Sequence, residues 1–171
     1  MIKIVLTGPE STGKSTLAKQ LADHFDASMV PEFARYFIDN LDRDYIESDL
    51  LDIAKGQLEY EQHQSLLSSE ILICDTDLLT IKIWSEFKYG KCDPQILKWI
   101  EQLKYDHYLL CGTDIAWQFD PQRENPDDRE ALYEMHKKEL LFYQKPFSEI
   151  KGDGNQRFNS AVRLINSMLK K

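Results

Sequence analysis

The sequence contains few of the residues that build disulfide-bonded, fibrous or membrane-spanning proteins. Its 171 residues include only 3 cysteines, 7 glycines and 6 prolines. Three scattered cysteines exclude a disulfide framework and a cysteine metal cage, so we expect Cys74 and Cys111, which each end an apolar run, to be core thiols. No apolar run approaches the about 18 residues of a membrane span, and the apolar stretch at the N-terminus is too short for a signal peptide. These absences predict a cytoplasmic globular protein.

Acidic residues outnumber basic ones. Lys and Arg number 21 and Asp and Glu number 29, so the formal net charge is −8. This balance argues against nucleic-acid or membrane partners, although it allows a local basic pocket. Because no repeat, low-complexity tract or linker divides the chain, we expect residues 1–171 to form a single domain. The sequence leaves open whether that domain forms a homo-oligomer.

Short apolar runs alternate with amphipathic segments along the whole chain. The runs predict strands at 2–7, 27–30, 70–74, 108–111 and 146–150. The amphipathic segments predict helices at 14–25, 49–68, 78–87, 94–104, 129–144 and 156–169. Continuously apolar strands that alternate with helices are typical of a mostly parallel sheet covered on both faces. We therefore predict a three-layer α/β fold with a five-stranded sheet, whose ligands bind at the carboxyl ends of the strands.

A phosphate-binding loop (P-loop) follows the first predicted strand. The segment from Gly8 to Ser15 matches the pattern G-x-x-x-x-G-K-S/T. Glycines allow successive backbone N–H groups to point at phosphate oxygens, and the following helix adds its positive end. The bland alternative is a Gly-rich turn that precedes a helix by coincidence. The predicted nucleotide-binding residues are Gly8, Glu10, Ser11, Thr12, Gly13, Lys14, Ser15 and Thr16.

Two aspartates follow the third predicted strand. Asp75 comes directly after a buried run, where a carboxylate can reach Mg²⁺ beside the phosphates together with the Ser15 hydroxyl. Asp77 faces the same way if the chain stays extended, and it then contacts the substrate or the metal. The alternative for either residue is to cap the helix that begins at Leu78.

An acid and an arginine follow the second predicted strand. Glu32 can face an acceptor and take the proton from its hydroxyl group. Arg35 lies on the same side if residues 33–38 are helical, and it can hold the acceptor or a phosphate. The alternative is a surface ion pair between Glu32 and Arg35 that contributes little.

The polar segment after the fourth strand predicts a mobile lid at about 112–130. Arg123 and Arg129 can close over the transferring phosphate, neutralise charge and exclude water. For Arg129 the alternative is a solvated helix start. The turn at 152–157 can lie near a base, although capping by Asp153 or Asn155 is the simpler interpretation. The four histidines lack ligand spacing and are interpreted as surface or boundary residues, and Trp84 is interpreted as packing.

These residues support a Mg-nucleotide site without naming the acceptor. The chain lacks the guanine-reading N-K-x-D of switch GTPases and the L-S-G-G-Q signature of transporter ATPases. The remaining classes are a small phosphotransferase and an ATP-dependent regulator.

The chain resembles the ribosylnicotinamide kinase domain found at the C-terminus of bacterial NadR regulators. The blocks that carry the resemblance are the P-loop with its Glu-Ser pair, residues 31–37, residues 55–57, the D-T-D block at 75–77, the lid with Trp117, Asp120, Arg123 and Arg129, and the turn at 153–159. Together they run from residue 4 to about 165. The P-loop alone is unspecific, and the joint order of the blocks is what carries the resemblance.

The resemblance implies a P-loop kinase-like fold and phosphoryl transfer from ATP to the 5′-hydroxyl of nicotinamide riboside, which gives nicotinamide mononucleotide. In this reading Lys14 and Ser15 bind ATP and Mg²⁺, and Asp75 assists the metal. Glu32 and Asp77 bind the acceptor or accept its proton. A kinase for another nucleoside or small hydroxyl metabolite, and a nucleotide-binding regulator with little transferase activity, are the alternatives.

The resemblance also assigns the remaining site residues and has two departures. Arg123 and Arg129 act from the lid as catalytic groups. Pro31 stands where a stacking aromatic is expected, so a flat pyridine ring loses one possible face, and Tyr60 and Tyr36 are the candidates that could compensate as substrate-binding residues. The P-loop begins at residue 8, so we expect neither the adenylyltransferase nor the DNA-binding part of the full regulator.

Overall fold

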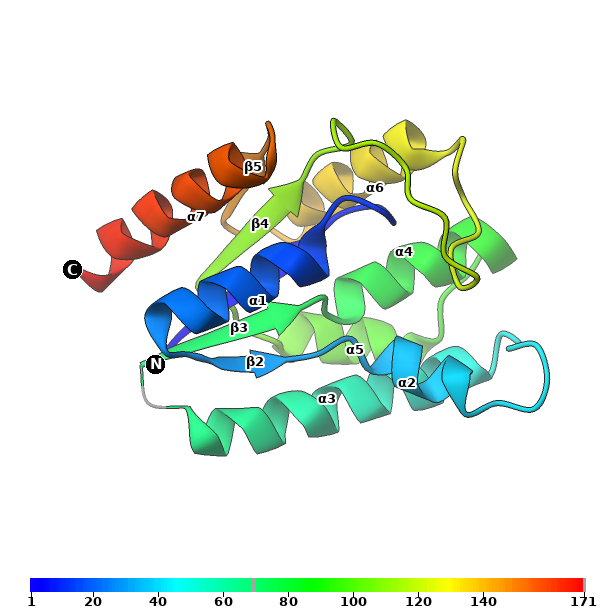
Figure 1. The fold of residues 1–171 in the computed structure, drawn as a ribbon. Helices are drawn as coiled ribbons and strands as arrows, with labels where there is room; N and C mark the ends of the chain where they lie inside the picture. Colours follow the sequence, from blue (N-terminus) through cyan, green and yellow to red (C-terminus); the bar gives the residue numbers. More distant parts are fainter. Residues whose placement is uncertain (69, 171) are drawn as a thin grey trace.

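The computed structural model describes residues 1–68 and 70–170 and has one parallel sheet between two layers of helices (Figure 1). The strands are β1 (Ile2–Thr7), β2 (Ser28–Val30), β3 (Ile71–Asp75), β4 (His107–Cys111) and β5 (Phe147–Ile150). Their order in the sheet is β2-β3-β1-β4-β5, and every pairing is parallel. The predicted fold class, a five-stranded parallel sheet flanked by helices, is confirmed.

The helices connect the strands and cover both faces of the sheet. They are α1 (Lys14–Phe25), α2 (Phe33–Asp39), α3 (Asp49–Leu67), α4 (Leu78–Tyr89), α5 (Pro94–Gln102), α6 (Arg129–Phe142) and α7 (Gly154–Leu169). The helix and strand ends differ from the predicted ones by no more than about two residues, as is usual for frayed termini. None of the helices in the described ranges is both long and apolar enough to cross a membrane.

The pleat of the strands divides the core into two clusters. Ile4 and Leu6 of β1 pack with Leu21 of α1 and Ile165 of α7, all fully buried. Val5, between them in the sequence, points to the other face, where α3, α4, α5 and α6 pack. Because neighbouring side chains in a strand point to opposite faces, a continuously apolar strand fills both clusters. Each fully buried aliphatic side chain contributes about 1.5–3 kcal/mol.

The functional segments leave the carboxyl ends of the three central strands. β1 leads into the P-loop, β3 ends at Asp75, and β4 leads into the polar segment 112–128. The close approach of β1 and β4 explains the first P-loop glycine, because a Cβ at Gly8 would lie 2.7 Å from the Cys111 carbonyl oxygen. Gly8 also has φ 132°, a conformation that side chains disfavour. The central strands therefore bring the P-loop and the lid together at one edge.

Candidate functional site

A cavity of about 380 Å³ opens at the carboxyl ends of the central strands. Its size is that of small-molecule sites in proteins. Its walls come from the P-loop, from α2, from α4, and from the lid and the helices that flank it. They include Gly8 through Thr16, Glu32, Arg35, Thr80, Trp84, Phe87, Gln118, Gln122, Arg123 and His136. All eight predicted nucleotide-binding residues line this one cavity.

The P-loop has the backbone conformation of an anion-binding nest. Ser11 and Gly13 have φ of 54° and 75°, and such turns direct successive N–H groups to one side. Two carbonyl oxygens of the loop accept hydrogen bonds from its own side chains. Lys14 Nζ donates to the carbonyls of Gly8 (2.9 Å) and Pro9 (2.7 Å), and Thr12 Oγ1 donates to Pro9 (2.8 Å). Lys14 therefore already lies against the loop on which a phosphate would sit.

Asp75 has the properties expected of a residue near a metal ion. It is 3% exposed, and its Oδ1 has no hydrogen-bond partner in the described part of the chain. Burial raises the pKa of the Asp75 carboxyl, whereas a hydrogen bond from Ser15 and the charge of Lys14 lower it. A buried carboxylate oxygen without a partner beside a serine hydroxyl fits the hard oxygen ligands that Mg²⁺ prefers.

The protein side chains alone do not make a complete metal cage. Within residues 1–68 and 70–170, no group of three or more His, Cys, Asp and Glu side chains could hold an ion. Asp75 and Ser15 would therefore hold Mg²⁺ only together with ligand oxygens, as in sites where the metal arrives with a phosphate. The donor set present fits a metal–nucleotide complex better than a resident metal ion.

The structure separates Asp77 from Asp75. Thr76 has φ 82°, so the chain is not extended there, and the assumption behind the predicted joint site is wrong. Asp77 is 2% exposed, is not part of the cavity wall, and accepts a hydrogen bond from Tyr108 Oη at 2.8 Å. Burial raises the pKa of Asp77 to about 6, although the Tyr108 hydroxyl acts in the opposite direction. This placement does not support the predicted contact with substrate or metal.

Glu32 is held at the cavity wall by the backbone around it. It is the N-cap residue of α2, and the Gln57 side chain accepts from Phe33 N (2.8 Å) and donates to the Pro31 carbonyl (3.2 Å). One amide group thus pairs with the residues on both sides of Glu32. Gly56 leaves room for this arrangement, because a Cβ there would lie 2.1 Å from the Phe33 ring.

The electrostatics of Glu32 suit a proton acceptor. Burial raises the pKa of Glu32, and the nearby Lys14 ammonium lowers it less. The predicted neighbour Arg35 also lines the cavity, with its Nε 3.5 Å from a Glu32 carboxylate oxygen. The ion pair named as the alternative is therefore present, but at the cavity and not on a remote surface. A carboxylate with a raised pKa is a better base near neutral pH.

The two tyrosines expected to stack on a ligand lie elsewhere. Tyr36 is 57% exposed, Tyr60 packs edge-on against Phe33 with ring centroids 4.9 Å apart, and neither lines the cavity. The aromatic side chains of the cavity wall come instead from α4, as Trp84 and Phe87. The periodicity of α4 indicated packing for Trp84, because the wall of a cavity and the wall of a core have the same apolar pattern.

The lid covers the P-loop through polar contacts. The Ser11 hydroxyl accepts from Gln118 N at 2.8 Å and from Arg123 Nη1 at 3.5 Å. The Glu10 carboxylate accepts from the backbone N–H groups of Glu124 (3.0 Å) and Asn125 (3.1 Å). Arg123 lines the cavity as expected for a residue that reaches the ligand. Glu10 and Ser11, both predicted to bind nucleotide, also contact the lid.

Arg129 has a different position from the one expected. Its Nη2 donates to the backbone carbonyls of Ser11 (3.1 Å) and Ile115 (2.8 Å), and the residue is not part of the cavity wall. Its Nε is buried and has no partner among the described residues. The guanidinium group thus contacts the backbone side of the P-loop. The alternative of a solvated helix start is not what this structure has.

The sequence interpretation missed His136. This residue is 3% exposed and lines the cavity, and its Nδ1 lies 2.8 Å from the Leu132 carbonyl. Burial lowers the pKa of His136 to about 4, so the ring is neutral at neutral pH. Its Nε2 has no partner in the described ranges and is available as an acceptor. No sequence signal marks it, since the elements that bury it and form the cavity come together only on folding.

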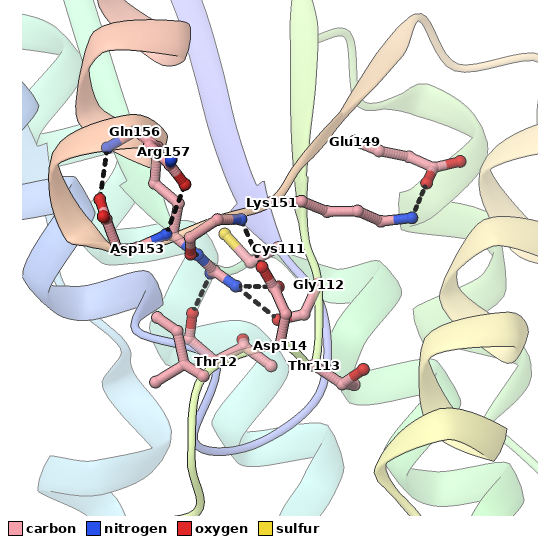
Figure 2. Close-up of polar contacts among 12 residues, drawn as sticks. Thr12, Cys111, Gly112, Thr113, Asp114, Glu149, Lys151, Asp153, Gln156 and Arg157 are labelled. Carbon is pink, nitrogen blue, oxygen red and sulfur yellow. Dashed lines mark hydrogen bonds and ion pairs between the residues drawn. The ribbon is translucent and has the colours of Figure 1, made fainter.

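The turn before α7 combines a helix cap with a second arginine. The Asp153 carboxylate accepts from Gln156 N at 2.8 Å, so the capping interpretation is confirmed for Asp153. Arg157, one residue further, was not singled out from the sequence. Its guanidinium group lies between Thr12 of the P-loop and the start of the lid (Figure 2).

Comparisons with known proteins agree with this fold and its P-loop. Among the curated relatives, the trifunctional NAD biosynthesis/regulator protein NadR of Salmonella typhimurium (strain LT2) is 27% identical over 173 residues, which are 97% of this chain and 42% of the relative. The NadR protein of Escherichia coli (strain K12) is 26% identical over 176 residues, with the same coverage. The chain spans less than half the length of these curated relatives, and the resemblance to NadR is confirmed.

Solved structures with the same fold include several kinases. A NadR protein in complex with NR matches with a TM-score of 0.78 and 17% identity, over 97% of this chain and 50% of that chain. Thymidylate kinase from Ehrlichia chaffeensis matches at 0.68 and 13%, over 96% and 98%. Deoxyadenosine kinase from M. mycoides matches at 0.62 and 16%, over 97% and 100%. At these identities the likeness confirms the P-loop kinase-like fold.

A family model described as an AAA domain matches residues 3–157 of the chain. That range contains the P-loop, Glu32, Asp75, the lid and Arg157. The chain belongs to this AAA domain family.

Proposed function

We propose that this protein is an ATP-dependent nucleoside kinase that phosphorylates the 5′-hydroxyl of nicotinamide riboside. The observation that carries the proposal is the joint presence of Lys14 and Glu32 on one cavity. A phosphate-binding loop with a lysine can bind the phosphates of ATP. A carboxylate with a raised pKa can accept the proton of an acceptor hydroxyl group.

In the proposed reaction each bond change has a side chain nearby. The 5′-oxygen forms a bond to the γ-phosphorus, the bond from that phosphorus to the ADP oxygen breaks, and the hydroxyl proton passes to Glu32. Lys14, the P-loop amides and Arg123 stabilise the charge on the transferring group. Mg²⁺, held by Ser15, Asp75 and phosphate oxygens, would neutralise further charge when bound. The lid excludes water, which would otherwise compete as the acceptor.

The choice of acceptor rests on the relatives and on the cavity. NadR is the name of both curated relatives, and one solved NadR structure holds NR. The cavity offers Trp84 and Phe87 as flat apolar surfaces and Arg35 as a polar group. A ribonucleoside with a flat ring matches such a wall.

A kinase for another nucleoside is the second candidate. The fold is shared with a thymidylate kinase and a deoxyadenosine kinase, each matched over nearly its whole length. An ATP-binding regulator without transferase activity is the third, and it predicts no dependence on Glu32.

A nucleoside panel tests the three candidates. ADP release is measured with MgATP plus nicotinamide riboside, adenosine, deoxyadenosine, deoxycytidine, thymidine or no acceptor. Stimulation by nicotinamide riboside above all others, with the mononucleotide found by mass spectrometry, is expected. Stimulation by another nucleoside favours the second candidate. No stimulation by any nucleoside contradicts nucleoside kinase function, and a Glu32→Ala variant that retains full turnover contradicts the role of Glu32 as the proton acceptor.

A further inference from the structure

Arg157 is a buried arginine, and four of its five N–H donors bind acceptors in the described part of the chain. It lies in the first turn of α7, and its side chain is 3% exposed. Its Nε donates to the Gly152 carbonyl (2.9 Å), and its Nη1 donates to the Thr12 carbonyl (2.6 Å). Its Nη2 donates to the Gly112 carbonyl (2.9 Å) and to the Asp114 carboxylate. Arg157 lines the cavity, and each of its three side-chain nitrogens binds at least one protein acceptor, so the guanidinium group is held mainly by the protein.

The partners of Arg157 belong to three separate loops. Thr12 lies in the P-loop, and Gly112 and Asp114 begin the lid (Figure 2). Gly152 precedes α7. Asp114 also accepts from Gly152 N, which closes the connection between the last two loops. One side chain therefore fixes the start of the lid and the base of α7 relative to the P-loop.

The bond to Thr12 determines where the next amide points. A peptide group is planar and trans, so the carbonyl of Thr12 and the N–H of Gly13 point in opposite directions. Arg157 holds that carbonyl, and Thr12, Gly13 and Arg157 all line the cavity. The Gly13 N–H therefore points away from the Arg157 guanidinium group, and in a loop of this conformation it is one of the N–H groups that can face a phosphate. Gly13 alone cannot hold this orientation, because glycine has the widest choice of backbone conformations.

We propose that Arg157 is a positioning residue that aims the Gly13 amide at the bound polyphosphate and links this orientation to the start of the lid. Arg129 holds the adjacent Ser11 carbonyl at 3.1 Å in the same way, so the carbonyls of two neighbouring peptide groups of the nest each accept from an arginine. The proposal rests on the proposed function only in taking a nucleoside triphosphate as the ligand of the loop.

The experiment compares phosphate binding with acceptor use in variants of the full chain. Arg157→Lys keeps the charge but not the planar fork that reaches three loops, and Arg157→Met keeps the length without donors. Arg163→Lys is the matched control, since Arg163 is an exposed residue of the same helix whose one side-chain hydrogen bond in residues 1–68 and 70–170 goes to Ser160. Binding of MgATP and of inorganic tripolyphosphate is measured by calorimetry, together with KM for the nucleoside and the thermal midpoint.

Arg157→Lys is expected to weaken binding of both probes about tenfold, because hydrogen bonds to a charged group are strong and their loss frees the peptide. The nucleoside KM should change less than about twofold. Arg163→Lys should change neither. A purely structural role would lower the thermal midpoint without selective loss of polyphosphate affinity, and a folded Arg157→Lys protein with unchanged tripolyphosphate binding overturns the proposal.

A third variant covers the case in which neither Arg157 variant folds. The side chain of Asp114 is 37% exposed, so the Asp114→Asn variant should fold. The change removes the negative charge that pairs with Arg157 and should weaken that interaction. A loss of tripolyphosphate affinity in the same direction supports the proposal, and unchanged affinity overturns it. None of these readouts needs an acceptor. The absence of any nucleoside-stimulated turnover would therefore overturn the proposed function and leave this test intact.

Discussion

Arg35 of α2 and Asp120 of the lid form an ion pair, with Nη1 and Oδ2 3.0 Å apart across 85 residues of sequence. The same guanidinium group lies 3.5 Å from the Glu32 carboxylate. Backbone hydrogen bonding from Gln122 lowers the pKa of Asp120, and Arg35 lowers it further. The position of the lid and the side chain proposed as the base are thus connected through one arginine.

Replacing Asp120 by Asn should impair acceptor use more than stability. The pair is partly exposed, so its loss should cost less than about 1 kcal/mol of folding free energy. KM for the nucleoside should rise about three- to tenfold, because Arg35 loses the partner that orients it. Steady-state kinetics with varied nucleoside and a thermal melt measure the two effects. Asp127→Asn, an exposed lid residue, is the control, and an unchanged KM for Asp120→Asn would contradict the connection.

Glu32→Gln should abolish most turnover while leaving nucleotide binding nearly intact. Loss of a general base reduces kcat by about 10²- to 10⁴-fold, whereas Gln keeps the size of the side chain. In the unmodified protein kcat/KM should rise with pH, because the deprotonated carboxylate is the active form, and the midpoint should lie above the ordinary value of 4.5. Glu59→Gln, an exposed change on α3, should behave as wild type. A pH profile identical in Glu32→Gln would refute the assignment.

Gly56→Ala should displace the helix that carries Glu32. The added methyl group would lie 2.1 Å from the Phe33 ring at the start of α2, so that ring has to move. Overpacking of this kind costs about 1–3 kcal/mol, which exceeds the gain of about 1 kcal/mol in helix propensity. Chemical denaturation should give a lower unfolding free energy, and kcat should fall with it. The exposed neighbouring change Lys55→Ala should do neither, and a stabilised Gly56→Ala protein would contradict the packing.

His136 should make the protein less stable in acid. Its folded pKa is about 4 and its ordinary value is 6.5, so the unfolded chain binds a proton more readily between these values. Stability should therefore be retained above pH 6.5 and fall as the pH drops toward 4. The loss at pH 5 relative to pH 7 should be about 2 kcal/mol from this residue.

Urea unfolding at both pH values tests this contribution. His136→Gln should reduce the difference between the two pH values, whereas His24→Gln, at an exposed position of α1, should leave it unchanged. An equal acid sensitivity of His136→Gln and the unmodified protein would show that His136 is not held neutral by burial.

The sequence was sufficient for the parts of the site that depend on neighbouring residues. The P-loop is a local turn pattern, and strands read as apolar runs end where Glu32 and Asp75 begin. Because the ends of parallel strands meet at one edge, their location in the sheet followed from the fold class. The lid followed from composition, as a polar stretch between a strand and a helix.

The local sequence pattern did not predict the position of a side chain where that position depends on one backbone angle or on a residue distant in the sequence. The left-handed φ of Thr76 turns Asp77 away from Asp75, and a threonine in the sequence does not indicate that conformation. Tyr36 and Tyr60 were assigned by a family expectation, while Trp84 of another helix lines the cavity. His136 is buried, and the residues next to it in the sequence do not indicate this.

The amino-acid sequence by itself determined the α/β fold, the P-loop and the acids at the strand ends, because each depends on residues close together in the chain. Tertiary structure alone decided that Arg157 lies behind Thr12, 145 residues away, that Asp120 reaches Arg35, and that Asp77 faces Tyr108. Such contacts form only when separate loops are brought to the same edge of the sheet, and periodicity and spacing contain no record of that packing.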